Sequence, residues 1–193
     1  MLLLYSIVAG LLIGRLAGGR LDGLTTARFR LAPLALGGLL FQLVLFSPFA
    51  TERVGDLGPV LYVASTAAVL VALLANLRLP GLWILAIGAG MNLVAIVANG
   101  GYMPADPEGV AALGLRGAGY TNSIVLTDPA LPFLTDIFAM PAWMPAANIF
   151  SIGDVLLGIG VAMTIALAMR GTSPAGQSKS GSAGGAPDST GAR

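Results

Sequence analysis

The stretch "VANGGYMPADPEGV", Val97 to Val110, ends a long apolar run abruptly at Asn99-Gly100-Gly101. Asparagine and glycine tolerate left-handed backbone conformations and commonly close helices. We therefore expect a helix to stop here and the chain to turn back over it. A new apolar run restarts at "NIFSIGDVLLGIG", Asn148 to Gly160, with an aspartate near its head. Residues 99–150, called the connecting segment below, thus join two long helices.

The composition indicates a membrane protein. Of 193 residues, 56% are hydrophobic and 10% are charged, whereas soluble domains carry about 25% charged residues. The charges lie between long apolar runs, which is typical of multispanning proteins. The chain has no cysteine and no histidine, which excludes disulfides, thiolate nucleophiles and the commonest metal ligand. Chemistry here must use carboxylates, amides, hydroxyls or arginine, and we expect no cofactor and no nucleic-acid partner.

The apolar runs predict an all-α integral membrane protein with a bundle of five transmembrane helices. Each run is long enough, or nearly so, to cross about 30 Å of hydrocarbon. The predicted spans are residues 2–16, 31–49, 57–77, 80–98 and 151–169. The bundle as a whole covers residues 1–170. The Gly/Ser/Ala/Pro-rich residues 171–193 are expected to form a disordered cytoplasmic tail, because they cannot bury enough apolar surface to fold.

The basic residues predict the orientation. Most of them follow the first, third or fifth span, at Arg15, Arg20, Arg28, Arg30, Arg78, Arg170, Lys179 and Arg193. Only Arg53 and Arg116 fall on the other side. Cytoplasmic loops carry an excess of Lys and Arg. We therefore expect a multi-pass protein of the inner (plasma) membrane with its N-terminus outside and its C-terminus in the cytoplasm.

Small residues recur at every fourth position through the first span and just beyond it, at Gly10, Gly14 and Gly18. Such rows let helix backbones approach closely in lipid. They serve either packing within one bundle or the formation of a homodimer, and we favour packing within the bundle.

The connecting segment is expected outside the cell. Its second half is apolar but interrupted by Pro129, Pro132, Pro141 and Pro145, so it cannot form a spanning helix. It is also too apolar to lie freely in water, which predicts an interfacial or re-entrant element over residues 124–150. We expect a short helix near Pro132–Ala139, with Trp143 at headgroup depth.

Two aspartates are the strongest candidates for a site. Ser151 and Asp154 match a capping box, and Asp154 also lies inside an apolar run, where ionisable groups are functional candidates. Asp136, in "FLTDIF", is the natural second carboxylate. The simple interpretation is that Asp154 only caps its helix. The alternative is that the connecting segment folds down and brings the two carboxylates together.

Polar side chains nearby complete the set of ligand-binding candidates. They are Asn92, Asn99, Tyr102, Asn122, Asn148 and the two aspartates. Asn92 serves either an interhelical hydrogen bond or a ligand, and Asn99 either a helix cap or, with Tyr102, the lining of an outward-facing cavity. Asp128, Asp136, Asn122 and Asp154 could bind a hard cation, but their spacing matches no loop signature, so no metal is assigned.

The motifs "NLVAIVANGGYMP", "FLTDIF" and "NIFSIGDVLLGIG" resemble an uncharacterised family of small bacterial integral membrane proteins, a domain-of-unknown-function family. The resemblance covers roughly residues 1–170. It implies a multispanning fold and no particular activity.

A partial resemblance connects the chain to lipoprotein signal peptidases, which are membrane aspartyl proteases. Asn92 in "GAGMNLVAI" resembles their first motif, and Asp136 with "NIFSIGDVLLGIG" resembles their second. Ala95 stands where the first catalytic aspartate would fall. The resemblance therefore implies hydrolysis only if Asp136 and Asp154 supply the two carboxylates that such chemistry needs.

Three functions remain open. We favour a non-enzymatic binding or accessory subunit in the lipid bilayer, whose extracytoplasmic face binds a lipid, a small ligand or another membrane subunit. The first alternative is a membrane aspartyl-type hydrolase with Asp136 and Asp154 as catalytic candidates. The second is a small transporter or channel, for which Gln42 and Asn92 are the main polar candidates within the spans.

Overall fold

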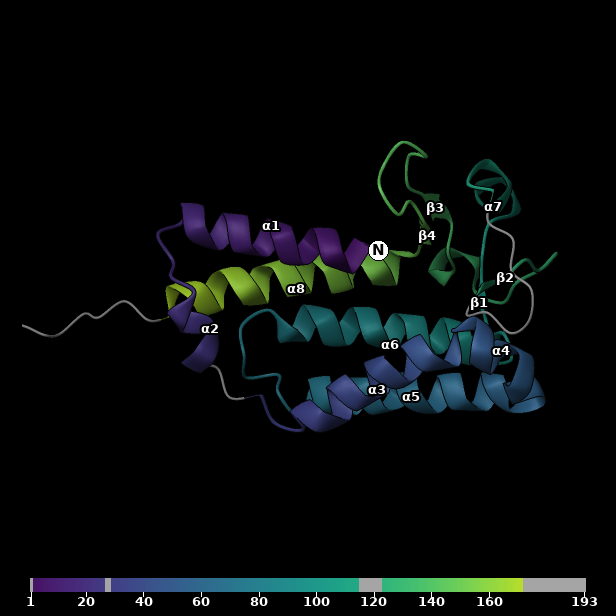
Figure 1. The fold of residues 1–193 in the computed structure, drawn as a ribbon, viewed down its shortest axis with the longest axis horizontal. Coiled ribbons are helices and arrows are strands. Elements are labelled where there is room, and N and C mark those ends of the chain that lie inside the picture. The colour runs from purple at the N-terminus through teal and green to yellow at the C-terminus, as the bar shows by residue number, and fades with distance from the viewer. Residues whose placement is uncertain (1, 27–28, 115–122, 172–193) are drawn as a thin grey trace, which may run out of the picture.

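The fold is mostly helical, and its long helices run side by side (Figure 1). The computed structural model describes residues 2–26, 29–114 and 123–171; the predicted tail beyond Gly171 and the candidate Asn122 lie outside these ranges. The five long helices are α1 (Leu2–Leu16), α3 (Ala32–Leu45), α5 (Gly58–Leu74), α6 (Leu82–Ala98) and α8 (Ile152–Arg170). α1 packs on α8, α8 on α6, α6 on α5 and α5 on α3.

The helix boundaries follow four of the five predicted spans closely and differ in the second. The span predicted at residues 31–49 ends early, at Leu45. A separate helix, α4 (Pro48–Val54), follows, and the 3-10 turn η1 (Gly55–Leu57) leads into α5. Proline has no N–H to continue a helix but fits the first turn of a new one. Pro48 therefore begins α4. A short helix, α2 (Asp22–Thr26), follows α1.

Within the described residues, two continuous helical stretches are long and apolar enough to cross a membrane. They are Pro48–Leu74, with 27 residues, and Ile152–Arg170, with 19 residues. Leu2–Leu16, Ala32–Leu45 and Leu82–Ala98 are apolar but shorter. Large apolar side chains are exposed along these helices, with Leu16 88% and Leu43 72% exposed. An exposed apolar surface of this extent suggests contact with lipid and a membrane location.

The small residues of α1 pack against α8 within the bundle, as we favoured. A Cβ atom on Gly10 would lie 2.8 Å from the Cα atom of Ala162. One on Gly14 would lie 2.6 Å from the sulfur of Met169. Gly18 has no such neighbour within 4 Å. The first two glycines of the row therefore permit the close approach of α1 and α8.

The connecting segment contains short strands that the all-α prediction missed. β1 (Met103–Pro104) pairs in parallel with β2 (Ser123–Ile124), in the register Met103↔Ser123 and Pro104↔Ile124. β3 (Phe138–Ala139) pairs in antiparallel fashion with β4 (Ile149–Phe150), in the register Phe138↔Phe150 and Ala139↔Ile149. A six-residue helix, α7 (Pro107–Ala112), follows β1. All of these elements gather at one end of the bundle (Figure 1).

The prediction of a short helix near Pro132–Ala139 was wrong. Only a 3-10 turn, η2 (Pro132–Leu134), forms there. Thr135 then takes an extended conformation, and Asp136 pairs with Ala105 in an isolated parallel bridge. Pairing with strands from other parts of the segment satisfies this backbone in place of helical hydrogen bonds.

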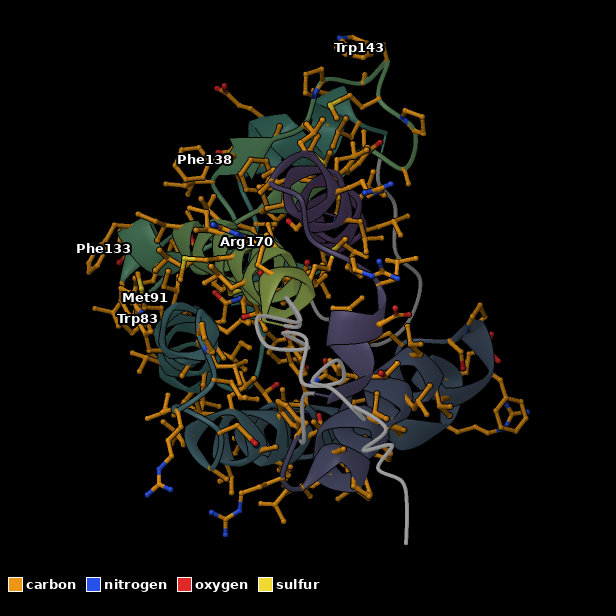
Figure 2. All side chains as sticks on the ribbon, turned by 90° about the vertical axis from the view of Figure 1, so that its left-hand side faces the viewer. Trp83, Met91, Phe133, Phe138, Trp143 and Arg170 are labelled. Carbon is orange, nitrogen blue, oxygen red and sulfur yellow. The ribbon has the colours of Figure 1, made fainter. Side chains whose placement is uncertain are left out.

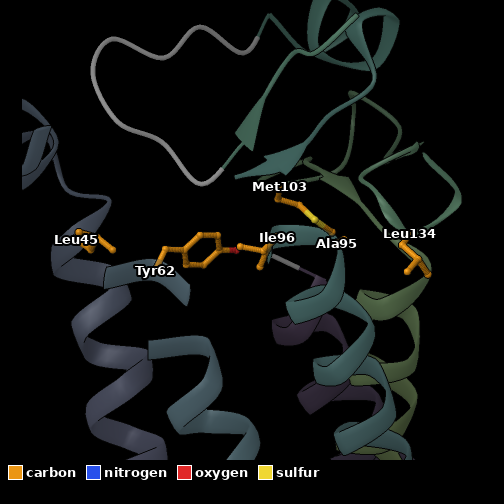
Figure 3. Close-up of a cluster of buried hydrophobic side chains, with 6 residues drawn as sticks. All are labelled: Leu45, Tyr62, Ala95, Ile96, Met103 and Leu134. Atoms are coloured by element: carbon orange, nitrogen blue, oxygen red, sulfur yellow. The ribbon is translucent and has the colours of Figure 1, made fainter. Parts of the chain in front are cut away.

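A buried cluster attaches the connecting segment to the bundle (Figure 3). Its members come from α3, α5, α6, β1 and η2 and are Leu45, Tyr62, Ala95, Ile96, Met103 and Leu134. Ala95 and Ile96 are almost completely buried. The cluster therefore fixes the segment against the helices at two points, Met103 near its start and Leu134 in η2.

Candidate functional site

A cavity of about 190 Å³ lies where the connecting segment meets α1 and α8. Its lining comes from α1, the connecting segment and α8 and consists of Leu2, Leu3, Asp136, Met140, Asn148, Ile149, Phe150, Asp154 and Leu157. We call it the acidic cavity, because both aspartates predicted as site candidates line it. Apart from Asn148, the other lining residues have apolar side chains, but polar atoms make up the larger part of the cavity surface.

Asp154 is held by a network that joins α6 to α8. The Ser151 hydroxyl accepts a hydrogen bond from the Asp154 N–H (3.1 Å), and the Asp154 Oδ2 accepts one from the Ser151 N–H (3.2 Å). The predicted capping box is thereby confirmed. The Asn92 amide donates to the Asp154 Oδ1 over 2.7 Å, and the Ser151 hydroxyl donates to the Asn92 Oδ1 over 2.9 Å. Asn92 thus makes the interhelical hydrogen bond that was one of its two interpretations.

This network depends on the close approach of α6 and α8. A Cβ atom on Gly88 would lie 2.5 Å from the Gly153 carbonyl oxygen and 2.8 Å from the Leu157 nitrogen. A Cβ atom on Gly153 would overlap the Asn92 side-chain oxygen. The two glycines therefore bring the helix backbones close enough for Asn92 to reach Ser151 and Asp154.

Asp136 is positioned by the backbone of the connecting segment. Its N–H donates to the Pro104 carbonyl, and its carbonyl accepts from the Asp106 N–H, each over 2.9 Å. These bonds form the bridge between Ala105 and Asp136. β3 then continues toward β4, where the Phe138 and Phe150 rings stack with their centroids 5.6 Å apart. The backbone on both sides of Asp136 is therefore fixed.

The Asp136 carboxyl group is buried and incompletely paired. The residue is 5% exposed, and its Oδ1 has no hydrogen-bond partner among the described residues. Burial, followed by the nearby charge of Asp154, raises the pKa of Asp136 to about 8. A buried carboxylate without partners is costly, and the group responds by keeping its proton. At neutral pH this carboxyl group is therefore mostly neutral.

Besides Asn92, which bonds Asp154, only Asn148 among the other described candidates lies in the acidic cavity. Asn148 is exposed and lines the acidic cavity. The Asn99 side chain donates to the Ala130 carbonyl over 2.9 Å and accepts from the Ala130 N–H over 2.8 Å. Tyr102 packs against the cluster of Figure 3. Neither Asn99 nor Tyr102 lines the acidic cavity.

The turn after α6 differs in detail from the expectation. Asn99 is the C-terminal cap residue with a φ of −109°, so it is not left-handed. Gly100 and Gly101 take the positive values of 70° and 90° instead. Glycine has no Cβ atom to clash in this region. The Gly100-Gly101 pair therefore turns the chain, while Asn99 ties the turn to Ala130.

The described residues do not form a metal centre of the usual kind. No group of three or more acidic side chains comes together among them. Asp128, one of the four possible cation ligands, is exposed and does not line the acidic cavity. Among the described residues, Asp136 and Asp154 are therefore the two carboxyl groups that could still bind a hard cation together.

Sequence reasoning missed most of the apolar lining. Leu2 and Leu3 begin α1, Met140 and Ile149 flank the β3–β4 turn, and Leu157 lies one turn after Asp154. Only the spacing of Leu157 from Asp154 could have signalled a shared helix face. The others are distant in sequence and meet only in the folded chain.

Comparison with known proteins identifies the family of the chain but does not indicate an activity. Curated proteins and solved structures gave no match. The profile of a family of unknown function, DUF5317, matches residues 26–166. The match covers α3, α5 and α6, the connecting segment and most of α8, and so includes both aspartates. The chain therefore belongs to the DUF5317 family.

Proposed function

We propose that this protein is an integral membrane protein of five spans that binds a small ligand in the acidic cavity, at its extracytoplasmic end. The single observation that carries the proposal is the buried Asp136 carboxyl group, which has an unpartnered oxygen and lines a cavity shared with Asp154. Ligand sites are usually concave and combine apolar side chains with a few converging polar groups.

Exposed aromatic side chains support the membrane assignment. Trp83 near the start of α6 and Phe133 in η2 lie along one side of the molecule, and Trp143 projects from the β3–β4 turn (Figure 2). They are 54%, 62% and 82% exposed, respectively. Tryptophan and other aromatic residues are enriched where lipid meets water. Trp83 and Trp143 would then mark the two membrane surfaces.

The ends of the bundle support the proposed orientation. The N-terminus of α1 lies at the same end as the connecting segment (Figure 1). Arg15 in the last turn of α1 and Arg170 in the last turn of α8 lie at the opposite end. By the positive-inside rule, that end would face the cytoplasm. The acidic cavity would therefore open on the extracytoplasmic side.

A screen of small molecules by thermal shift, with the full chain in detergent, tests ligand binding. Hits at the acidic cavity should disappear in Leu157→Trp, which fills the cavity from α8. They should persist in Ile159→Trp, because Ile159 is 50% exposed on the same helix and does not line the cavity. Hits that bind both variants equally, or a broad screen without hits, would contradict the proposal.

A hydrolase is the second candidate, and the shared cavity of Asp136 and Asp154 favours it. Aspartyl hydrolases use two carboxyl groups, of which one holds a proton while the other acts as a base. The raised pKa of Asp136 fits the protonated member. Asp154 fits the second role less well, because the Asn92 and Ser151 groups already bind its two oxygens. Cleavage of membrane-anchored peptides that is lost in both Asp136→Asn and Asp154→Asn, with retention in Asp106→Asn, would establish this function.

The two polar side chains that could line a transport path, Gln42 and Asn92, form hydrogen bonds between helices. The Gln42 amide donates to the hydroxyls of Ser65 (3.2 Å) and Thr66 (3.1 Å), which joins α3 to α5. Asn92 joins α6 to α8. We therefore favour binding over transport. Substrate flux in proteoliposomes that stops in Gln42→Leu, while folding is retained, would reverse this preference.

A further inference from the structure

We infer that the ligand of the acidic cavity is a small organic cation, with a primary ammonium or amidinium group on a short apolar body. This inference rests on the proposed ligand-binding function and specifies its chemistry. It follows from three properties of the cavity: the free oxygen of Asp136, the hydrogen-bonded carboxyl group of Asp154, and the apolar side chains that line the cavity beside them.

The charge of the site selects a cation. Asp136 and Asp154 line the cavity, and its described lining includes no Arg or Lys. An anion would meet two acidic groups without a compensating charge. A cation that donates a hydrogen bond to the Asp136 Oδ1 would instead give this buried oxygen the partner it lacks. Charge-assisted hydrogen bonds of this kind are about twice as strong as neutral ones.

The set of oxygen atoms selects an organic cation over Ca²⁺. Calcium takes about six to eight oxygen ligands. The cavity offers the carboxyl groups of Asp136 and Asp154 and the side chain of Asn148. The Asp154 oxygens already accept hydrogen bonds from Asn92 and Ser151. An ammonium or amidinium group needs only a few acceptors, because it carries its charge on hydrogen-bond donors.

The size and walls of the cavity define the rest of the ligand. An apolar cavity of about 150 Å³ accommodates benzene, and the acidic cavity measures about 190 Å³. It therefore has room for one ring, or a chain of similar volume, together with a cationic group. Met140, Ile149 and Leu157 provide apolar contacts for that body. Benzylammonium and n-butylammonium are suitable probes.

Binding would be coupled to the release of a proton. The neutral Asp136 carboxyl group must lose its proton to form an ion pair, and the proton passes to the solvent as the cation enters. Among the described residues, Asp154 on α8 shares the cavity with Asp136, Asp106 after β1 bonds the Asp136 backbone, and Tyr5 is the ionisable side chain in the first turns of α1. The Asp106 carboxylate accepts from the Gly109 N–H (2.8 Å), and the Tyr5 hydroxyl donates to the Pro145 carbonyl (2.7 Å). Asp154 is therefore the group that couples to Asp136.

Calorimetric titration of the full chain in detergent tests the inference. The probes are benzylammonium, n-butylammonium, benzyl alcohol, benzoate and Ca²⁺, each at pH 6, 7 and 8. We expect benzylammonium to bind at least tenfold more tightly than benzyl alcohol at pH 8. Because the pKa of Asp136 is about 8, affinity should rise about tenfold for each pH unit between 6 and 7 and less steeply toward 8. Titrations at pH 7 in buffers of different protonation enthalpy should show the release of about one proton.

Variants assign the effect to Asp136. Asp136→Asn should weaken benzylammonium binding at least tenfold at pH 8 and abolish its pH dependence. Asp106→Asn is the matched control, because Asp106 is a neighbouring carboxylate that does not line the cavity, and asparagine keeps its helix cap. It should leave the affinity unchanged.

The outcomes separate this inference from the function on which it rests. Equal binding of benzylammonium and benzyl alcohol, or tighter binding of benzoate or Ca²⁺, would overturn the organic-cation ligand. If one of these other probes binds and its binding is lost in Leu157→Trp, that probe occupies the acidic cavity. The proposed ligand-binding function would then stand although the organic-cation inference fails. If no probe binds and the earlier screen also finds no ligand, both proposals fail. The comparison of charged and neutral probes uses the unaltered chain, so it remains decisive even if a variant does not fold.

Discussion

Replacing Asp136 by asparagine should remove most of the pH dependence of stability above pH 5. The pKa of Asp136 is about 8 in the folded chain and about 3.9 for an aspartate in an unfolded chain. Between these values the folded chain holds one proton more than the unfolded chain, so stability falls as pH rises. The contribution is fully present below about pH 4 and lost by about pH 8.

The size of the effect follows from the same two values. Each pH unit in this window costs about 1.4 kcal/mol, so from pH 5 to pH 8 the wild type should lose about 4 kcal/mol. For a chain of this length that corresponds to roughly 8–16 °C in the midpoint of thermal unfolding. Asparagine resembles the neutral carboxyl group in shape and has no charge to bury. The two proteins should thus be similar in stability at pH 5, and the variant should be more stable at pH 8.

Thermal unfolding in detergent, followed by tryptophan fluorescence at pH 5, 6, 7 and 8, measures this difference. Asp106→Asn serves as the control and should follow the wild type, because Asp106 caps α7, does not line the acidic cavity, and keeps its cap as asparagine. Parallel pH profiles for the wild type and Asp136→Asn would refute the reasoning. They would mean that water or a counter-charge reaches the Asp136 carboxyl group in the folded chain.

The remaining predictions concern the contacts that position the site. Gly153→Ala should destabilise the chain by about 1–3 kcal/mol, because its Cβ would overlap the Asn92 oxygen, whereas Gly90→Ala, with open space around it, should be neutral or stabilising in the same unfolding assay. Asn92→Leu should cost about 1.5–3 kcal/mol by denaturant unfolding, since the Asp154 Oδ1 loses its donor. Asn99→Ala should speed hydrogen exchange of the Ala130 N–H more than that of the α8 amides, because only the former depends on the Asn99 side chain.

The raised pKa of Asp136 also bears on the choice between the two leading functions. A hydrolase requires the proton on Asp136 for its chemistry, so cleavage should fall as pH rises above about 8. Binding of an organic cation requires the proton to leave, so affinity should rise toward the same pH. The two functions therefore predict opposite trends from one carboxyl group, and a pH series on either readout discriminates between them.

Local sequence determined much of the helical framework. The apolar runs predicted all five long helices, because hydropathy and prolines act within a short stretch of chain. The capping box of Ser151 and Asp154 could be predicted for the same reason, since its two residues lie on one helical turn. The end of α6 at Asn99-Gly100-Gly101 was also evident, although the left-handed residues are the glycines and not Asn99.

Tertiary structure alone decided which distant segments meet to line the acidic cavity. Strands of two residues have no periodicity that a sequence could reveal, so the bridge from Ala105 to Asp136 went unpredicted, and an apolar stretch that begins with a proline was interpreted as a helix. Pairing across the connecting segment places Asp136 beside Asp154, and packing of α1 brings Leu2 to the same cavity. Such contacts depend on which distant segments meet when the chain closes. The pattern of neighbouring residues does not carry that information, whereas it does specify a helix and its cap.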